Sequence, residues 1–159
     1  MESFGEWYER EHDRMIATLV LTTGDLDLAT DGVDEACSRA LERWTRVREM
    51  DSPTGWIYRV ALNHVRRAAR RRSFEQRLNY RSLVPSALPE PASEIWHVVS
   101  QLAPRQRQVV VLRHVAQLSE AEIGATLGIS RGTVSSTLRD AHHRLGRLLD
   151  DGIEEEKNV

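Results

Sequence analysis

The stretch LSEAEIGATLGISRGTVSSTLRDA, residues 118–141, decides the fold class. Ser119 followed by Glu122 forms a capping box, in which each side chain accepts a hydrogen bond from a backbone N–H group at a helix start. Gly128 supplies the left-handed conformation that ends this helix, and Ser130 caps the next one. Two short helices joined by a tight turn that contains glycine are typical of a helix-turn-helix.

The second of these helices has two distinct faces. Apolar residues recur at spacings of three and four and are predicted to point inward: Val134, Leu138, Ala141, Leu145 and Leu148. The opposite face presents Arg131, Gly132, Ser135, Ser136 and Arg139. Small polar side chains allow a helix to approach the major groove closely, and arginine binds guanine or phosphate. A hairpin that only packs a helical bundle is the alternative interpretation of this face.

The charge of the chain is divided into blocks. The formal net charge is -2 and the pI is about 6.3, which is unusual for a DNA-binding protein. Residues 1–52 hold 6 Arg against 13 Asp or Glu, whereas residues 53–81 hold 8 Arg against Glu75 alone. Residues 104–149 carry 7 Arg against 3 acids. The near-neutral total therefore conceals two basic blocks, which indicate surfaces for different partners.

The denser basic block lies on a helix that is predicted to begin at Ser52, the N-cap, and Pro53, the first helical residue. Helical spacing places one basic stripe opposite an apolar one, and the stripe consists of Arg59, Asn63, Arg66, Arg67 and Arg70. Trp56 and Tyr58 stand at the head of this helix, where their rings could stack on unpaired bases. Burial in a small helical core is the alternative for each ring.

Helical periodicity also covers the preceding residues and predicts an all-α protein of two modules. One helix starts at Phe4 and stops at Gly24, and its apolar face is predicted to hold Phe4, Tyr8, Met15 and Leu19. The next repeats apolar residues at Leu28, Val33, Cys37, Leu41 and Trp44. Residues 76–92 hold three prolines and no sustained period, which indicates a flexible linker. We therefore expect domains at 1–75 and 93–149, and a disordered acidic tail at 150–159.

Several classes of function lack support in the sequence. Cys37 is the only cysteine, so an intrachain disulfide and a thiolate zinc site are excluded, and burial is the expected role of this residue. The six histidines show no metal-ligand spacing, and no catalytic motif is present, so we expect neither a metal, a cofactor nor an enzyme. No apolar run reaches the roughly 18–20 residues that span a bilayer, and a signal peptide is lacking. Membrane insertion is therefore not expected, and the cytoplasm is the expected location.

Three segments in this order resemble the extracytoplasmic-function (group IV) sigma factors of bacterial RNA polymerase. DLATDGVDEACSRALERW resembles the family's D-x-A-x-D-x-x-Q-E-x-F-x-R-A-W segment, and SPTGWIYRVALNHVRRAARRR is similar to its P-x-x-W-L-Y-R-x-A-x-N helix. LAPRQRQVVVLRHVAQLSEAEIGATLGISRGTVSSTL resembles its L-P-x-R-Q-R … L-S-x-x-E-I-A-x-x-L-G-I-S-x-G-T-V-K-S-R-L block. The resemblance covers nearly the whole chain.

This resemblance implies a role for each module. Residues 1–75 would dock on the clamp of the largest polymerase subunit and capture melted minus-ten DNA, with Asn63 at the base-capturing pocket. The residues that match the clamp-facing helix are Asp31, Asp34, Glu35, Arg39 and Trp44. Residues 93–149 would touch the flap of the second-largest subunit and read the minus-thirty-five duplex through Arg131, Gly132, Thr133, Ser135, Ser136 and Arg139. Promoter DNA and an anti-sigma factor are further expected partners, and we expect the free protein to be a monomer.

The chain departs from the family pattern at several positions. Asp34 replaces the usual Gln and Cys37 the usual Phe, while Ser135-Ser136-Thr137 stands where relatives carry Lys-Ser-Arg. The loss of two basic side chains predicts weaker phosphate binding by this helix. Two alternatives therefore stay open: a stand-alone helix-turn-helix regulator, and a sigma-like protein that binds partners but no longer reads DNA.

Overall fold

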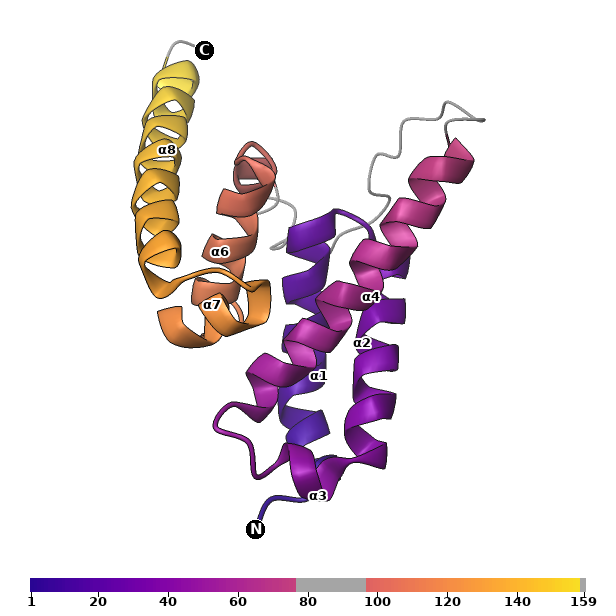
Figure 1. The fold of residues 1–159 in the computed structure, drawn as a ribbon. Coiled ribbons are helices and arrows are strands. Elements are labelled where there is room, and N and C mark those ends of the chain that lie inside the picture. Colours follow the sequence, from indigo (N-terminus) through magenta and orange to yellow (C-terminus); the bar gives the residue numbers. More distant parts are fainter. Residues whose placement is uncertain (77–96, 158–159) are drawn as a thin grey trace. The chain divides into compact units, whose positions relative to one another are not determined.

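The computed structural model describes residues 1–76 and 97–157, and the elements within them are helices, which confirms the all-α prediction. The chain forms two compact units, Met1–Leu88 and Pro89–Val159 (Figure 1). The predicted linker, residues 76–92, lies outside the described residues except for Gln76, the last residue of α4.

The first unit is built from α1 (Phe4–Thr23), α2 (Leu26–Glu42), the short α3 (Trp44–Val47) and α4 (Pro53–Gln76). The sequence predicted three helices here and missed α3, which turns the chain between α2 and α4 (Figure 1). Ser52 accepts a hydrogen bond from the N–H group of Gly55 at 3.1 Å, which confirms the predicted N-cap of α4. Gly24 ends α1 with φ 71°, as its position predicted.

The core of this unit lies where α2 packs against α1 and α4. Met15 and Leu19 of α1 are fully buried as predicted. Phe4 and Tyr8 were also expected in the core but are only half-buried, and Trp7 is the buried aromatic residue of α1. A Cβ atom on Gly32 would lie 2.7 Å from Cγ2 of Val65 and 3.2 Å from the carbonyl oxygen of Ala61. Gly32 therefore allows the backbones of α2 and α4 to approach closely.

Two expectations for α2 had different outcomes. Cys37 is buried as expected, and burial raises the pKa of its thiol to about 11. Leu41, predicted to face the core, is 59% exposed, while the neighbouring Ala40 is fully buried. The small side chain of Ala40 allows the helices to pack closely. Leu41 is the next residue, about 100° further around the helix, so its side chain points away from the core.

The second unit contains α6 (Pro104–His114), α7 (Glu120–Leu127) and α8 (Arg131–Lys157). Its core includes Val109, Leu112, Ile123 and Val134, which are all almost fully buried. The acidic tail was predicted to be disordered from residue 150, but α8 continues to Lys157. No proline interrupts residues 150–157, and the three Glu residues and the Lys in this segment favour the helical conformation.

Candidate nucleic-acid interfaces

The outward face of α4 presents the predicted basic stripe. Ile57, Ala61 and Val65 on the opposite face are buried. Arg66 is half-buried, and the exposed members of the stripe are Arg59, Asn63, Arg67 and Arg70. One helix thus packs with its apolar side and offers cationic and amide groups on the other, which suits binding to a nucleic-acid backbone.

A hollow of about 90 Å³ lies between α2 and α4. Its lining consists of Arg39, Val60, Asn63, His64 and Arg67. Arg39 was assigned to polymerase docking by resemblance, yet here it lines the same hollow as Asn63. Two arginines, one amide and one imidazole offer hydrogen bonds to the edge of a base or to a phosphate oxygen.

An acidic patch adjoins this hollow on α2. Asp31 and Asp34 are exposed and Glu35 is half-buried. Together with Ser38 they line a second, open hollow that also includes His64. Nε of Arg39 donates to Glu35 Oε1 at 2.6 Å, so an ion pair connects the acidic patch to the basic hollow. His64 borders both hollows, which places a cation-attracting and an anion-attracting surface side by side.

The two aromatic residues at the head of α4 differ in their accessibility. Trp56 is half-buried in the first turns of the helix. Tyr58 is fully buried, and its hydroxyl lies 3.1 Å from that of Thr18 on α1. The expected contact of Tyr58 with DNA does not fit this position, because a ring without exposed surface cannot stack on a base. Helical geometry explains the outcome, since Tyr58 lies beside Ile57 on the buried face.

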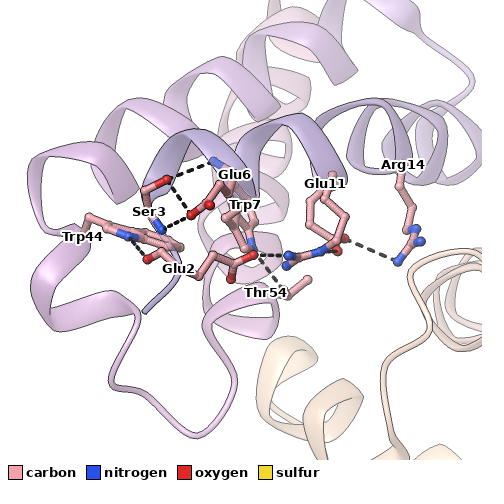
Figure 2. Close-up of polar contacts among 9 residues, drawn as sticks. Glu2, Ser3, Glu6, Trp7, Glu11, Arg14, Trp44 and Thr54 are labelled. Carbon is pink, nitrogen blue, oxygen red and sulfur yellow. Dashed lines mark hydrogen bonds and ion pairs between the residues drawn. The ribbon is translucent and has the colours of Figure 1, made fainter.

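Trp44 packs within an aromatic cluster at the start of the chain. Its ring lies edge-on to Phe4, with ring centroids 5.5 Å apart, and 5.7 Å from the ring of Trp7. Nε1 of Trp44 donates to the carbonyl oxygen of Glu2 at 3.2 Å, and Nε1 of Trp7 donates to Thr54 Oγ1 at 3.3 Å (Figure 2). Trp44 is half-buried by these contacts, so it stabilises the packing of α3 against the start of α1.

One arginine of the run RRAARRR, residues 66–72 of α4, contributes to the fold. Nη1 of Arg72 donates to Asp25 Oδ2 at 2.7 Å, and Asp25 Oδ1 accepts from the N–H group of Leu28 at 2.8 Å. Asp25 thus caps α2 and binds α4 with its two oxygens. Arg72 is therefore engaged within the unit, whereas the sequence alone grouped it with the other basic residues of the run.

The helix-turn-helix of the second unit forms as predicted. Ser119 accepts from the N–H group of Glu122 at 3.2 Å, and Ser119 N donates to Glu122 Oε2 at 2.7 Å, which confirms the capping box. Gly128 adopts φ 70° at the end of α7. Ser130 accepts from the N–H group of Thr133 at 3.1 Å and so caps α8. The turn is tight enough that a Cβ atom on Gly124 would lie 2.8 Å from the carbonyl oxygen of Ile129.

The outward side of α8 carries the predicted reading residues. Val134, Leu138 and Ala141 are buried, whereas Leu145 and Leu148 are only half-buried, because α8 extends beyond the helices that cover its apolar side. Ser135 is half-buried, and the exposed reading residues are Arg131, Gly132, Thr133, Ser136 and Arg139. Nε of Arg131 lies 3.5 Å from Glu120 Oε2 on α7. An acidic group therefore stands beside the first arginine of the reading face.

Two arginines of α6 that could have contacted phosphate hold loops instead. Nη2 of Arg107 donates to the carbonyl oxygens of Ser100 at 2.9 Å and Leu102 at 3.3 Å. Nη1 of Arg113 donates to the carbonyl oxygen of Leu118 at 3.0 Å. Arg105 is exposed. These contacts favour a structural role for Arg107 and Arg113, and both Arg105 and Arg113 keep exposed side chains.

A histidine pair that the sequence did not reveal joins α6 to α8. Nε2 of His114 lies 3.0 Å from Nε2 of His142, although 28 positions separate them in the chain. Desolvation, together with the nearby His142 and Arg113, lowers the pKa of His114. Among the described residues, no group of three or more potential ligands could hold a metal ion. None of the described helices is long and apolar enough to cross a membrane.

Comparisons with known proteins agree on one family. The model of sigma-70 region 2 matches residues 7–75, and that of sigma-70 region 4 matches residues 98–146. RNA polymerase sigma-E factor of Streptomyces coelicolor is 31% identical over 93% of this chain and 85% of its own length. Its namesake in Streptomyces antibioticus is 32% identical over 93% of this chain and 83% of its own. ECF RNA polymerase sigma factor SigE of Mycolicibacterium smegmatis is 29% identical over 91% of this chain and 61% of its own.

Solved structures share the fold. The sigma factor RpoE, crystallised with the anti-sigma factor NepR from Bartonella quintana, superposes with a TM-score of 0.76 at 18% identity, over 92% of this chain and 96% of that one. CnrH, in complex with the cytosolic domain of CnrY, superposes with a TM-score of 0.63 at 21% identity, over 93% and 88% of the two chains.

Proposed function

Because the chain belongs to the extracytoplasmic-function sigma factors of the sigma-70 family, which direct transcription initiation by RNA polymerase, we propose that its two units divide promoter recognition between them. The family is non-enzymatic and implies core RNA polymerase and promoter DNA as partners. The residues of this chain therefore contribute binding energy, while core polymerase carries out the chemistry. We assign the domain boundaries 1–75 and 93–149 to the two functions.

The first unit captures melted minus-ten DNA on α4. The observation that carries this proposal is the hollow in which Asn63, Arg67 and Arg39 converge beside an exposed basic stripe. A base that leaves the duplex would find hydrogen-bond donors in the hollow, and the stripe would hold the neighbouring phosphates. Trp56 is the aromatic residue available for stacking, and Tyr58 supports the helix from the core.

The first unit docks on the largest-subunit clamp through the acidic patch of α2. Asp31 and Asp34 are exposed on the face next to the proposed DNA-binding hollow, and Glu35 holds Arg39 by a hydrogen bond. Opposite charge on the partner would steer association there, while the basic stripe of α4 stays free for DNA. An acidic chain can bind DNA in this way because its negative charges face polymerase.

The second unit reads the minus-thirty-five duplex with α8 and contacts the flap of the second-largest subunit. Arg131, Thr133 and Ser136 are exposed in the first turns of α8, where a recognition helix contacts base edges. Gly132 lets the backbone approach DNA closely, and Ser135 and Arg139 extend the contact. The alternative of a stand-alone regulator would need a dimer interface that spaces two half-sites.

We also propose that an anti-sigma factor regulates the protein, since the RpoE relative was crystallised with one. The free chain is then a monomer in the cytoplasm, where core polymerase and promoter DNA are found.

The decisive experiment combines the purified chain with core polymerase and a genome-wide library of promoter fragments. We expect the complex, but not the chain alone, to select a set of fragments that share two elements and to open the minus-ten element. Selection of fragments by the chain alone at the same salt concentration would favour the stand-alone regulator. Polymerase binding without any selected fragment would favour the sigma-like protein that no longer reads DNA.

A further inference from the structure

The DNA-facing side of α8 continues beyond the helix-turn-helix. Residues at successive spacings of three and four share the side opposite the buried Val134, Leu138 and Ala141. From the first turn onward this side carries Gly132, Ser136, Arg139, His143, Gly146 and Arg147. The first three belong to the predicted reading face, and the last three lie in the turns that follow it.

The continuation is cationic and accessible. Arg139, His143 and Arg147 are exposed, and among the described residues neither arginine forms an ion pair. Together with His142, Gly146 and Asp150 they line an open hollow along the helix. A Cβ atom on Gly146 would meet no atom within 4 Å, so the helix backbone is bare at the centre of the hollow. We call Arg139, His143 and Arg147 the distal stripe.

We propose that the distal stripe binds phosphates of duplex DNA at the edge of the major groove, beside the minus-thirty-five element. This inference rests on the proposed function of the second unit and adds a contact that the helix-turn-helix does not supply. Arg147 also lies outside residues 98–146, which match the model of sigma-70 region 4.

The length of α8 suits such a contact. Ser136 of the reading face and Arg147 are eleven positions apart, which corresponds to about 16 Å along a helix axis. The major groove is about 12 Å wide, so the first turns of α8 can contact bases while later turns of the same side reach the phosphates that border the groove. Asp150 closes the hollow with a negative charge and sets the distal limit of the stripe.

The distal stripe also accounts for the missing phosphate contacts of the reading face. Ser135 and Thr137 carry no charge in the middle of the reading face, and Asp140 adds a negative charge. Each phosphate contact releases counterions and contributes about 0.9 to the slope of log K against log salt concentration. Arg147, almost three turns beyond Thr137 on α8, can restore one such contact without changing the residues that read bases.

Arg144 provides a matched control for Arg147. Both are exposed arginines of the same helix without an ion pair among the described residues. They are three positions and about 60° apart on the helix, but Arg144 stands about 140° from Arg139 around the helix, whereas Arg147 stands about 80° from it. Arg144 therefore lies outside the distal stripe. Arg147→Gln and Arg144→Gln therefore each remove one positive charge at nearly the same position along the axis of α8. Only Arg147→Gln removes the proposed contact.

The test measures binding of the chain, in complex with core polymerase, to a selected promoter duplex over a series of KCl concentrations. We expect Arg147→Gln to reduce the magnitude of the salt slope by about 0.9 and to weaken binding equally on duplexes that differ in the minus-thirty-five bases, since phosphate contacts carry no sequence information. Arg144→Gln should keep the wild-type slope. Circular dichroism of both variants should match the wild type.

Equal slopes for the two variants would overturn the inference and leave the stripe as a solvated face. Loss of polymerase association by Arg147→Gln would also overturn it, because the stripe would then contact protein. Wild-type complex that binds no promoter duplex would instead reject the proposed function itself.

Discussion

The hydroxyl group of Tyr58 lies 3.1 Å from that of Thr18, and this hydrogen bond joins α4 to α1 inside the core. The single hydroxyl proton of Thr18 is already donated to the carbonyl oxygen of Arg14, at 2.7 Å. Tyr58 is therefore the donor to Thr18. Burial raises the pKa of the Tyr58 phenol, which keeps this donor protonated near neutral pH. The basic stripe of α4 is thus positioned by a polar contact on the buried side of the helix.

Tyr58→Phe should lower the free energy of unfolding by about 1 kcal/mol, because it removes one buried hydrogen bond and keeps the ring. Urea denaturation of the purified chain measures this change. Opening of a selected promoter should stay at the wild-type level under conditions in which the variant is folded. A defect in strand opening by the fully folded variant would show that the tyrosine hydroxyl acts on DNA after all.

Asn63→Ala should impair strand opening and leave polymerase association intact, since Asn63 is exposed and lines the hollow between α2 and α4. Asp34→Asn should do the reverse, because Asp34 belongs to the acidic patch. Permanganate reactivity of minus-ten thymines reports opening, and competition for core polymerase reports association. If both variants lost both activities in equal measure, the two surfaces would not be functionally separate.

Arg131→Ala should weaken binding by about 1–3 kcal/mol at individual minus-thirty-five base pairs, the range for loss of a specific arginine contact. Glu120→Gln should strengthen binding to all duplexes at low salt, because it removes a carboxylate that lies 3.5 Å from Arg131. Competition among duplexes with single base changes separates these effects. A Glu120→Gln variant that lost affinity would indicate instead that the carboxylate orients Arg131 for DNA.

Asp25→Ala should lower the free energy of unfolding by about 1–2 kcal/mol, since it removes the N-cap of α2 as well as the partner of Arg72. Arg72→Ala should cost less, at most about 1 kcal/mol, because this ion pair is partly exposed. The neighbouring, exposed Arg71 provides the control, and Arg71→Ala should leave stability unchanged. A double-mutant cycle between Asp25 and Arg72 measures their coupling, and a value of zero would contradict the bridge.

The second unit should lose stability as the pH falls below about 6.5, the ordinary pKa of histidine. Desolvation, His142 and Arg113 lower the pKa of His114 in the fold, so the unfolded chain binds protons more readily in this range. The stabilisation is therefore complete above that pH and is lost as the pH falls through the lowered pKa. Thermal unfolding of the wild type and His114→Gln at pH 7.5 and 5.5 measures the difference. His143→Gln, on the exposed face, should keep the wild-type pH dependence.

The local signals in the sequence predicted helix ends correctly. Ser52, Ser119 and Ser130 cap helices, and Gly24 and Gly128 end them, because each signal acts on backbone groups within four residues of itself. The prediction for the tail at 150–159 was less successful, since composition indicated disorder where α8 continues to Lys157. An acidic composition indicates that a segment is well solvated, but it does not exclude a helical conformation.

The positions of side chains around each helix were harder to predict. Periodicity assigned Leu41 to the core, where Ala40 lies, and left the role of Tyr58 open between stacking and burial. The apolar face of an amphipathic helix has no sharp edge in the sequence. How closely the neighbouring helices pack decides which of the residues at that edge is buried. Gly32 marks the place where α2 and α4 come close enough to make this choice.

Local patterns in the sequence were enough to predict the all-α class, the order of the longer helices, the basic stripe of α4 and the caps of the helix-turn-helix, because these depend on residues within a few turns of one another. Only the tertiary structure brought Arg39 into the hollow of Asn63 and Arg72 onto Asp25. It alone placed His114 beside His142. These pairs come from different helices, and their distances depend on how closely the helices pack, which no local pattern of residues encodes.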